Sequence, residues 1–141
     1  MHARFAIFII ATATLLACTQ QPAPPAPDPE TILQTIPAAS AAEYEHVRDM
    51  KTWRNPYLIV RSDGVALYDV ADNAEIRLKP DELLPELAKL PASDWPYGRV
   101  VAAAETARTS DQDAAAIRRN KGIIGGMLQN AHIAVKWVPA T

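Results

Sequence analysis

The side chain with the clearest chemistry in this chain is the thiol of Cys18, the single cysteine among 141 residues. A thiol can be alkylated to a thioether, and this one directly follows Leu15, Leu16 and Ala17, at the end of an apolar run that begins at Phe5. A basic start, an apolar stretch and small residues before a cleavage point are the marks of a secretory signal peptide. The pattern predicts cleavage before Cys18 and attachment of lipid to its sulfur.

The same run could instead form an uncleaved membrane helix. From Phe5 to Ala17 it is shorter than the about 20 apolar residues that a spanning helix needs, so we expect a lipoprotein that acyl chains on Cys18 hold on the membrane. Thr19 stands where the inner-membrane retention signal of enteric-type bacteria has aspartate. In this respect the chain resembles lipoproteins of the outer membrane, with the folded part facing the periplasm.

Other groups with metal-binding or catalytic chemistry are few. His46 has Glu43 and Asp49 at spacings that could place two ligands on one helix face, but a solvated charged face is the commoner arrangement. His132 stands at a predicted junction between a helix and a strand, where a local polar contact is expected, and His2 belongs to the signal peptide. A nucleophile elbow is missing from the sequence. We therefore predict a protein that is not an enzyme and uses no cofactor and no metal ion.

A basic cluster is a candidate for binding. Arg118, Arg119 and Lys121 directly precede the glycine-rich stretch 122–126. Such a cluster is commonly a solvated face; the alternative is a contact for anionic material such as peptidoglycan, lipid headgroups or an acidic partner. The glycines resemble a phosphate-binding loop only superficially, because the Lys-Ser/Thr ending is missing. Since each glycine costs a helix roughly 1 kcal/mol relative to alanine, they predict either a break or close packing on the sheet.

Aromatic side chains are the second set of candidates for an interface. Trp53, Trp95 and Tyr97 lie in or next to predicted loops, and exposed aromatic residues carry much of the energy of protein interfaces. Trp137 differs, because it alternates with the aliphatic residues of the last predicted strand, so we expect it in the core.

Three segments are expected to position these residues: a signal peptide at 1–17, the lipidated cysteine with a disordered Pro-rich linker at 18–39, and a single periplasmic α/β domain at 40–141. Five prolines between Gln20 and Glu30 favour a stiff polyproline II spacer. Behind them, Ile32, Leu33 and Ile36 have helical spacing; they could dock a partner, pack back on the domain or belong to an irregular linker.

Within the domain, the patterns alternate between helix and strand. Helices are predicted from the capping pattern at Ser40 to Lys51, from Pro80 to Leu90 with an awkward Pro85, and from the cap at Ser110 to Ala131. Strands are predicted at 57–61 and 65–70, joined by the tight turn Asp63-Gly64, at 99–104 and at 133–138, with 75–78 as an extension of the sheet. This order favours an α+β two-layer sandwich, in which two or three helices pack on a small mixed sheet of about four strands. The last two strands should be parallel if they are neighbours.

Taken together, these patterns resemble the periplasmic domain of the ExbD/TolR family, over about Asn55 to Pro139. The matching residues are Asn55 to Val60, Asp63-Gly64, Pro80 to Leu84 with Leu87, Val100-Val101, Ala131 to Ile133 and Val135 to Pro139. Members of that family sit in proton-driven envelope machines, where this domain dimerises or touches peptidoglycan or a partner. The resemblance implies the fold, a binding role and a homodimer as one form. Proton coupling is not implied, because the apolar segment has no acidic residue.

The formal charge of the chain limits the classes of partner that we expect. Removing residues 1–17 leaves 124 residues and takes Arg4 from the 14 Lys and Arg that face 16 Asp and Glu, for a formal charge of −3. A nucleic-acid partner is not expected at this charge. We expect a binding or assembly module of the cell envelope, accessory to a transport or secretion system, with an envelope protein or peptidoglycan as partner. The alternatives are an immunity or inhibitor protein against a periplasmic toxin or hydrolase, and a hydrolase, which would need a cleft with convergent acidic groups or histidines.

Overall fold

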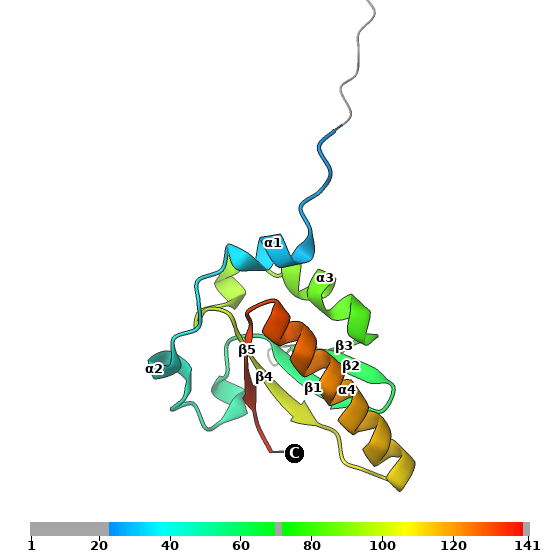
Figure 1. Cartoon of the computed structure of the whole chain (residues 1–141). Helices are drawn as coiled ribbons and strands as arrows, with labels where there is room; N and C mark the ends of the chain where they lie inside the picture. Colours follow the sequence, from blue (N-terminus) through cyan, green and yellow to red (C-terminus); the bar gives the residue numbers. More distant parts are fainter. Residues whose placement is uncertain (1–22, 70–71, 140–141) are drawn as a thin grey trace, which may run out of the picture.

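The domain is a five-stranded mixed sheet with helices on one face and an irregular segment on the other (Figure 1). The structure, a computed structural model, describes residues 23–69 and 72–139. The strands, in the spatial order β3-β2-β1-β4-β5, are β1 (Tyr57–Arg61), β2 (Gly64–Asp69), β3 (Ala74–Leu78), β4 (Val100–Glu105) and β5 (Ala134–Trp137). The helices are α1 (Pro29–Gln34), α2 (Ala41–Tyr44), α3 (Leu83–Ala88) and α4 (Asp111–Asn130), with 3-10 turns η1 (Met50–Thr52), η2 (Pro80–Glu82) and η3 (Ala92–Asp94). The predicted α+β class is confirmed.

Strand pairing follows the turn chemistry of the sequence. β1 and β2 form the predicted hairpin at Asp63-Gly64, with Tyr57 opposite Tyr68, and β3 adds to β2 as a second antiparallel pair. Gly64 has φ +147°, and a Cβ there would lie 2.3 Å from the carbonyl oxygen of Leu78, so only glycine fits. β4 is parallel to β1 and to β5, as predicted for the last two strands.

The main hydrophobic core lies between the sheet and the helices α1, α3 and α4. Its fully buried side chains include Leu58 and Val60 of β1, Leu83 of α3 and Ile124 of α4. Burying one such side chain contributes about 1.5–3 kcal/mol relative to leaving it in water. Ala103 of β4 is also fully buried in this core, whereas Ala102 and Ala104 pack on the second face of the sheet.

Residues before the predicted domain boundary at residue 40 pack on the domain, so the domain extends further toward the amino terminus than predicted. Asp28 caps α1 by accepting a hydrogen bond from the Thr31 N–H at 3.0 Å. Leu33 is fully buried and Ile36 is 7% exposed, both in the main core. Packing back on the domain is therefore the correct alternative for these aliphatic residues. Residues 23–28 form no helix or strand, and residues 18–22 of the predicted linker lie outside the described residues.

The helix predicted from Ser40 to Lys51 is wrong beyond its first turn. Only α2 and the 3-10 turn η1 form, and the Ser40 side chain makes no capping bond. The segment instead unwinds so that Val47 and Trp53 cover the second face of the sheet. Lys136 of β5 fixes it there, since its ammonium donates to the carbonyl oxygens of Tyr44 and Val47 at 2.8 and 2.6 Å. Burial lowers the pKa of this lysine.

The predicted helices at Pro80 and Ser110 both form, with small changes at their ends. The first begins as the 3-10 turn η2 and becomes α-helical at Leu83, so Pro85 falls in the first turn, where no backbone hydrogen bond is lost. The second is α4, and its cap is as predicted, because the Ser110 hydroxyl accepts from the Asp113 N–H at 3.1 Å.

One buried amide joins the segments at the start of the sheet. Asn55, 5% exposed, donates from Nδ2 to the carbonyl oxygens of Gly98 and Val100 at 2.7 and 2.8 Å. Its Oδ1 accepts from the Tyr97 N–H at 2.9 Å. All the polar atoms of this side chain are satisfied, and they fix the entry to β4 beside the entry to β1.

We predict that Asn55→Ala lowers the free energy of unfolding by about 2–4 kcal/mol, because it removes three hydrogen bonds to backbone groups, two of them fully buried. Urea unfolding followed by tryptophan fluorescence measures this loss. The matched control is Asn120→Ala, which removes two hydrogen bonds from a less buried amide to Arg61 and Ser62. An equal or smaller loss for Asn55→Ala would contradict a central role for this side chain.

Candidate binding surface

Two of the aromatic residues predicted to form an interface belong to the core. Trp53 and Trp95 are each 3% exposed, so neither can touch a partner. Trp53 lies between Tyr44 and Tyr97, with ring centroids 6.3 and 5.2 Å away, and its Nε1 donates to the Pro56 carbonyl at 3.2 Å. Tyr97 is half-buried against it. The prediction failed because the loops that carry these residues fold back onto the sheet.

Trp137 shows the opposite error, since it was expected in the core and is 39% exposed. The alternation in the last strand is real, because Ile133 is buried and Val135 packs against the same core. However, β5 is an edge strand, and Trp137 is its last residue. What covers the indole is the ammonium of Lys121, 4.3 Å from the ring centroid.

The basic cluster divides into one engaged and two free cations. Lys121 pairs with Glu105 of β4 at 2.7 Å, and Arg108 pairs with the other oxygen of the same carboxylate at 2.8 Å. Hydrogen bonds from Arg108 and Lys121 hold the pKa of Glu105 below its usual range. Lys121 thus fastens α4 to the sheet and is removed from the set of candidate binding residues.

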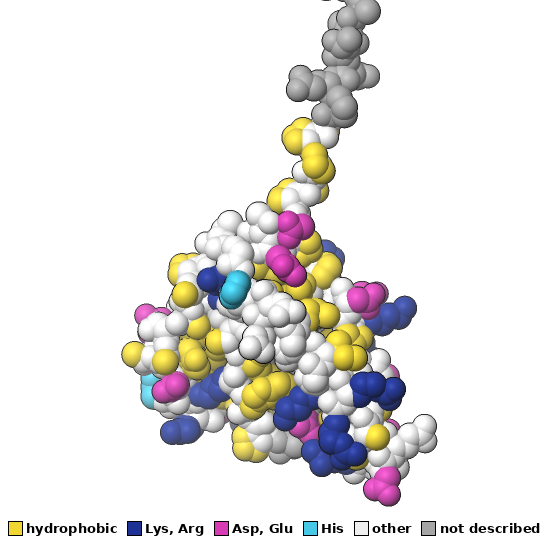
Figure 2. Space-filling view, viewed as in Figure 1, with side chains coloured by type: hydrophobic (Ala, Val, Ile, Leu, Met, Phe, Trp, Pro, Cys, Tyr) yellow, Lys and Arg dark blue, Asp and Glu magenta, His cyan; other side chains and the backbone are white. Residues whose placement is uncertain are grey.

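Arg118 and Arg119 remain available. Both are exposed on α4, and among the described residues neither guanidinium group takes part in an ion pair or a hydrogen bond. Figure 2 shows Lys and Arg side chains gathered over the middle of α4. Two neighbouring free guanidinium groups can bind carboxylates or phosphates in a bidentate manner.

The glycines of α4 were interpreted wrongly on both counts. The helix continues from Asp111 to Asn130 without a break. A Cβ placed on Gly122, Gly125 or Gly126 would meet nothing within 4 Å, so none of them packs closely on the sheet. The fold would accept alanine at all three positions, and alanine would be more stable there by about 1 kcal/mol each.

We define the α4 surface as Arg118, Arg119, Gly122, Ile123 and Gly126. Gly122 and Gly126 are one helical turn apart and lie with the arginines on the solvent side, while the Ile123 side chain is 47% exposed. The surface therefore combines two free cations, one aliphatic side chain and a stretch of bare backbone. It can make ionic contacts and let a partner approach the helix closely.

The remaining residues that the sequence singled out are Cys18, His46 and His132. Cys18 lies outside the described residues. His46 donates from Nδ1 to the carbonyl oxygen of Ala42 at 3.2 Å, and His132, at φ +56°, follows the end of α4. Residues 23–69 and 72–139 contain no group of three or more His, Cys, Asp or Glu side chains that could hold a metal ion. No helix in these ranges is long and apolar enough to cross a membrane.

Glu105 generates a prediction about acid stability. Because its folded pKa is lowered, the carboxylate contributes stability above the ordinary value of 4.5 and loses that contribution as the pH falls through the folded pKa. Glu105→Gln should lower the free energy of unfolding by about 1 kcal/mol at neutral pH. The difference from the original protein should shrink on acidification, as measured by urea unfolding over a pH series. The control is Glu86→Gln, which breaks one exposed ion pair with Lys89 and should have the smaller effect on the free energy of unfolding.

If Glu105→Gln lowers the free energy of unfolding by the same amount at every pH, the role assigned to this carboxylate is contradicted.

Comparisons of the chain with protein-family models, with curated proteins and with solved structures gave no match. The resemblance to ExbD/TolR periplasmic domains therefore rests on the residues quoted for it.

Proposed function

We propose that this chain is a lipid-anchored periplasmic module that binds an anionic component of the cell envelope through the α4 surface and catalyses no reaction. The observation that carries the proposal is the set of three glycines in a continuous helix where the fold requires none of them. They weaken α4 without improving any internal contact. Residues that lower the stability of their own helix without improving a contact inside the protein are expected at functional sites.

The charge of the surface supports an anionic partner. Arg118 and Arg119 are exposed, and within residues 23–69 and 72–139 their side chains have no internal partner, whereas the neighbouring Lys121 contacts Glu105 and Trp137. The carboxylates of peptidoglycan stem peptides and an acidic patch on an envelope protein both suit two guanidinium groups. We take peptidoglycan as the first partner and an acidic envelope protein as the second.

The position of the α4 surface also fits an anchored protein. Figure 1 shows residues 23–28 leaving the domain beside α1, whereas the amino-terminal half of α4 lies at the far end of the molecule. A lipid on Cys18 at the end of this segment would place the membrane on the α1 side, and the α4 surface, along the middle of the helix, would then lie on the side of the domain and not against the membrane. The signal pattern of residues 1–17 supports the anchor, and outer-membrane sorting follows from Thr19. The resemblance to ExbD/TolR domains supports an accessory role in a transport or secretion assembly.

The anchor is tested by Cys18→Ser in the full-length protein. We expect the original protein to incorporate a palmitate analogue and to sediment with the outer membrane. The variant should carry no label and leave the outer-membrane fraction, because one thiol is the only attachment point. Thr19→Ser, which keeps the thiol, is the control. Label on Cys18→Ser, or no label on the original protein, would contradict the anchor.

The α4 surface is tested by the double variant Arg118→Glu/Arg119→Glu. We expect it to lose at least about tenfold in affinity for purified peptidoglycan, or to lose the acidic partner in crosslinked pull-downs, because two attractive contacts become repulsive. Arg48→Glu/Lys89→Glu makes the same change of net charge away from α4 and should bind normally. Identical partners and affinities for both double variants would remove the α4 surface from the proposal.

The glycines allow a second measurement with the same partner. Gly122→Ala/Gly126→Ala should raise the free energy of unfolding by about 1–2 kcal/mol and weaken binding, because the added methyl groups hold the partner away from the helix. A gain of stability with unchanged binding would mean that the glycines have no role in the contact.

A further inference from the structure

Strand β3 forms one edge of the sheet, and no strand of the described residues pairs with its outer side. An open edge of this kind is a template to which another strand can add. Ala74, Glu75, Ile76 and Arg77 are exposed and Leu78 is half-buried, so neither face of β3 is fully covered. None of these residues belongs to the α4 surface, so this edge is independent of the proposed function.

The backbone groups that β3 directs outward belong to Glu75 and Arg77. The Val60 carbonyl of β1 accepts from the N–H that follows β4, at 3.0 Å, so Val60 forms a non-hydrogen-bonded pair with β2. Hydrogen-bonded and non-hydrogen-bonded pairs alternate in antiparallel strands, and this alternation makes Ile76 a hydrogen-bonded partner of Leu67. The N–H and C=O groups of Glu75 and Arg77, one residue to each side, therefore point out of the sheet.

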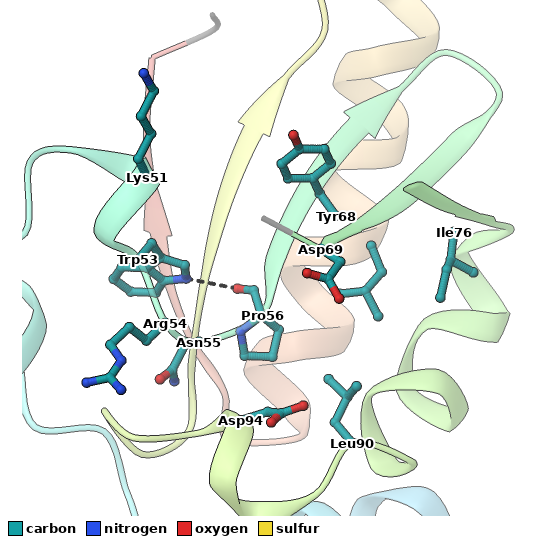
Figure 3. Close-up of a pocket in the computed structure, with 11 residues that line it drawn as sticks. Lys51, Trp53, Arg54, Asn55, Pro56, Tyr68, Asp69, Ile76, Leu90 and Asp94 are labelled. Atoms are coloured by element: carbon teal, nitrogen blue, oxygen red, sulfur yellow. Dashed lines mark hydrogen bonds between the residues drawn. The ribbon is translucent and has the colours of Figure 1, made fainter. Parts of the chain in front are cut away.

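The side chains of β3 alternate between apolar and charged. Ile76 lies on the helix face of the sheet, at one side of a cavity of about 560 Å³ (Figure 3), and is the most exposed large hydrophobic side chain among the described residues, at 49%. Glu75 and Arg77 lie on the second face, where their nearest opposite charges are Arg61 and Asp63, at 3.6 and 3.7 Å. Both distances exceed that of a hydrogen bond, so each group can form a closer ion pair.

Three antiparallel registers allow the outward backbone groups of β3 to bond to those of a second copy. Two of them place Glu75 opposite Glu75, or Arg77 opposite Arg77, and like charges directly opposite each other are destabilising. The third places Glu75 opposite Arg77 on both sides of a twofold axis. It also sets Ile76 opposite its own copy in a non-hydrogen-bonded pair, where side chains are closest. The strand is therefore complementary to itself in this one register.

We propose that two copies of this chain associate through β3, in the register that pairs Glu75 with Arg77 and Ile76 with Ile76. The two five-stranded sheets then form one continuous sheet. Each pair of Glu75 and Arg77 exchanges two backbone hydrogen bonds, and the two isoleucines cover each other. A contact of this symmetry is closed after two copies, so it leaves no free β3 edge on which further copies could add.

The contact is tested by a disulfide at its centre. In full-length protein that carries Cys18→Ser, Ile76→Cys supplies the single thiol, so a disulfide can only join two copies. The Cα atoms of a non-hydrogen-bonded pair lie about 4.5 Å apart, which a disulfide can span. Mild oxidation of the purified protein should give a dimer on non-reducing gels. Trp137→Cys, at the end of the other edge strand, is the matched control and should give at least about fivefold less dimer.

Charge reversals test the register. Ile76→Cys is combined with Glu75→Arg in one protein and with Arg77→Glu in another. Each protein alone places like charges opposite each other and should give at least about fivefold less dimer than Ile76→Cys. A mixture of the two should restore the dimer as the mixed species, which mass spectrometry identifies, because both pairs again have opposite charges. Urea unfolding of each reduced protein checks that the fold is kept.

Three results would overturn the proposal. The first is an equal amount of dimer from Ile76→Cys and from Trp137→Cys. The second is a mixture in which the mixed dimer is no more abundant than the dimers of the separate charge variants. The third is a purified protein that stays monomeric while Ile76→Cys forms a disulfide with a different protein in cells, since the edge of β3 would then have another occupant.

Discussion

The side chain of Asn55 is the constraint on which the rest of the domain depends. Its three hydrogen bonds hold the start of β1 against residues 97–100, so two strands that are far apart in sequence enter the sheet in parallel and in register. The same stretch receives the chain that follows α1, since the Arg99 N–H donates to Pro37 at 2.8 Å. Gly98 completes this junction with φ +75°, where a Cβ would lie 2.5 Å from the carbonyl oxygen of Ala38. Helix α1, strand β1 and strand β4 therefore meet at one point.

Local signals in the sequence were sufficient for the elements themselves. Asp63-Gly64 predicted the hairpin, Ser110 predicted the start of α4, and the pattern at 99–104 predicted β4. The way these elements and their side chains pack against each other was harder to predict from the sequence. The helix expected after Ser40 was lost because Lys136, a residue far along the chain, binds the carbonyl oxygens that a longer helix would have used. Trp53 and Trp137 exchanged their expected environments because burial depends on which loop folds back and which strand lies at the edge.

The α4 surface, too, could be predicted only in part from the sequence. Arg118, Arg119 and Lys121 look equivalent in the sequence, and only the position of Glu105 on the neighbouring strand distinguishes the engaged lysine from the free arginines. The glycines of α4 were visible, but their meaning depended on what surrounds them. The cavity of about 560 Å³ lined by Pro56, Leu67, Ile76 and Leu90, together with charged residues, could not be predicted, because it forms where β1, β2, β3 and the turn after α3 meet and no single segment carries a signal for it.

The contacts made by Gln34 and Lys136 have a consequence for the order in which the domain can assemble. Gln34 of α1 donates to the carbonyl of Ala131 at 3.0 Å, and Lys136 fastens the segment around Tyr44 and Val47. Both early segments thus close onto the last helix and strand of the sheet. A chain that crosses a membrane from its amino end would keep α1 and the α2 segment open until β5 arrives, since contacts of such sequence separation form late. In a chain exported in this way, the two ends of the domain would come together only after β5 had crossed, when translocation is nearly complete.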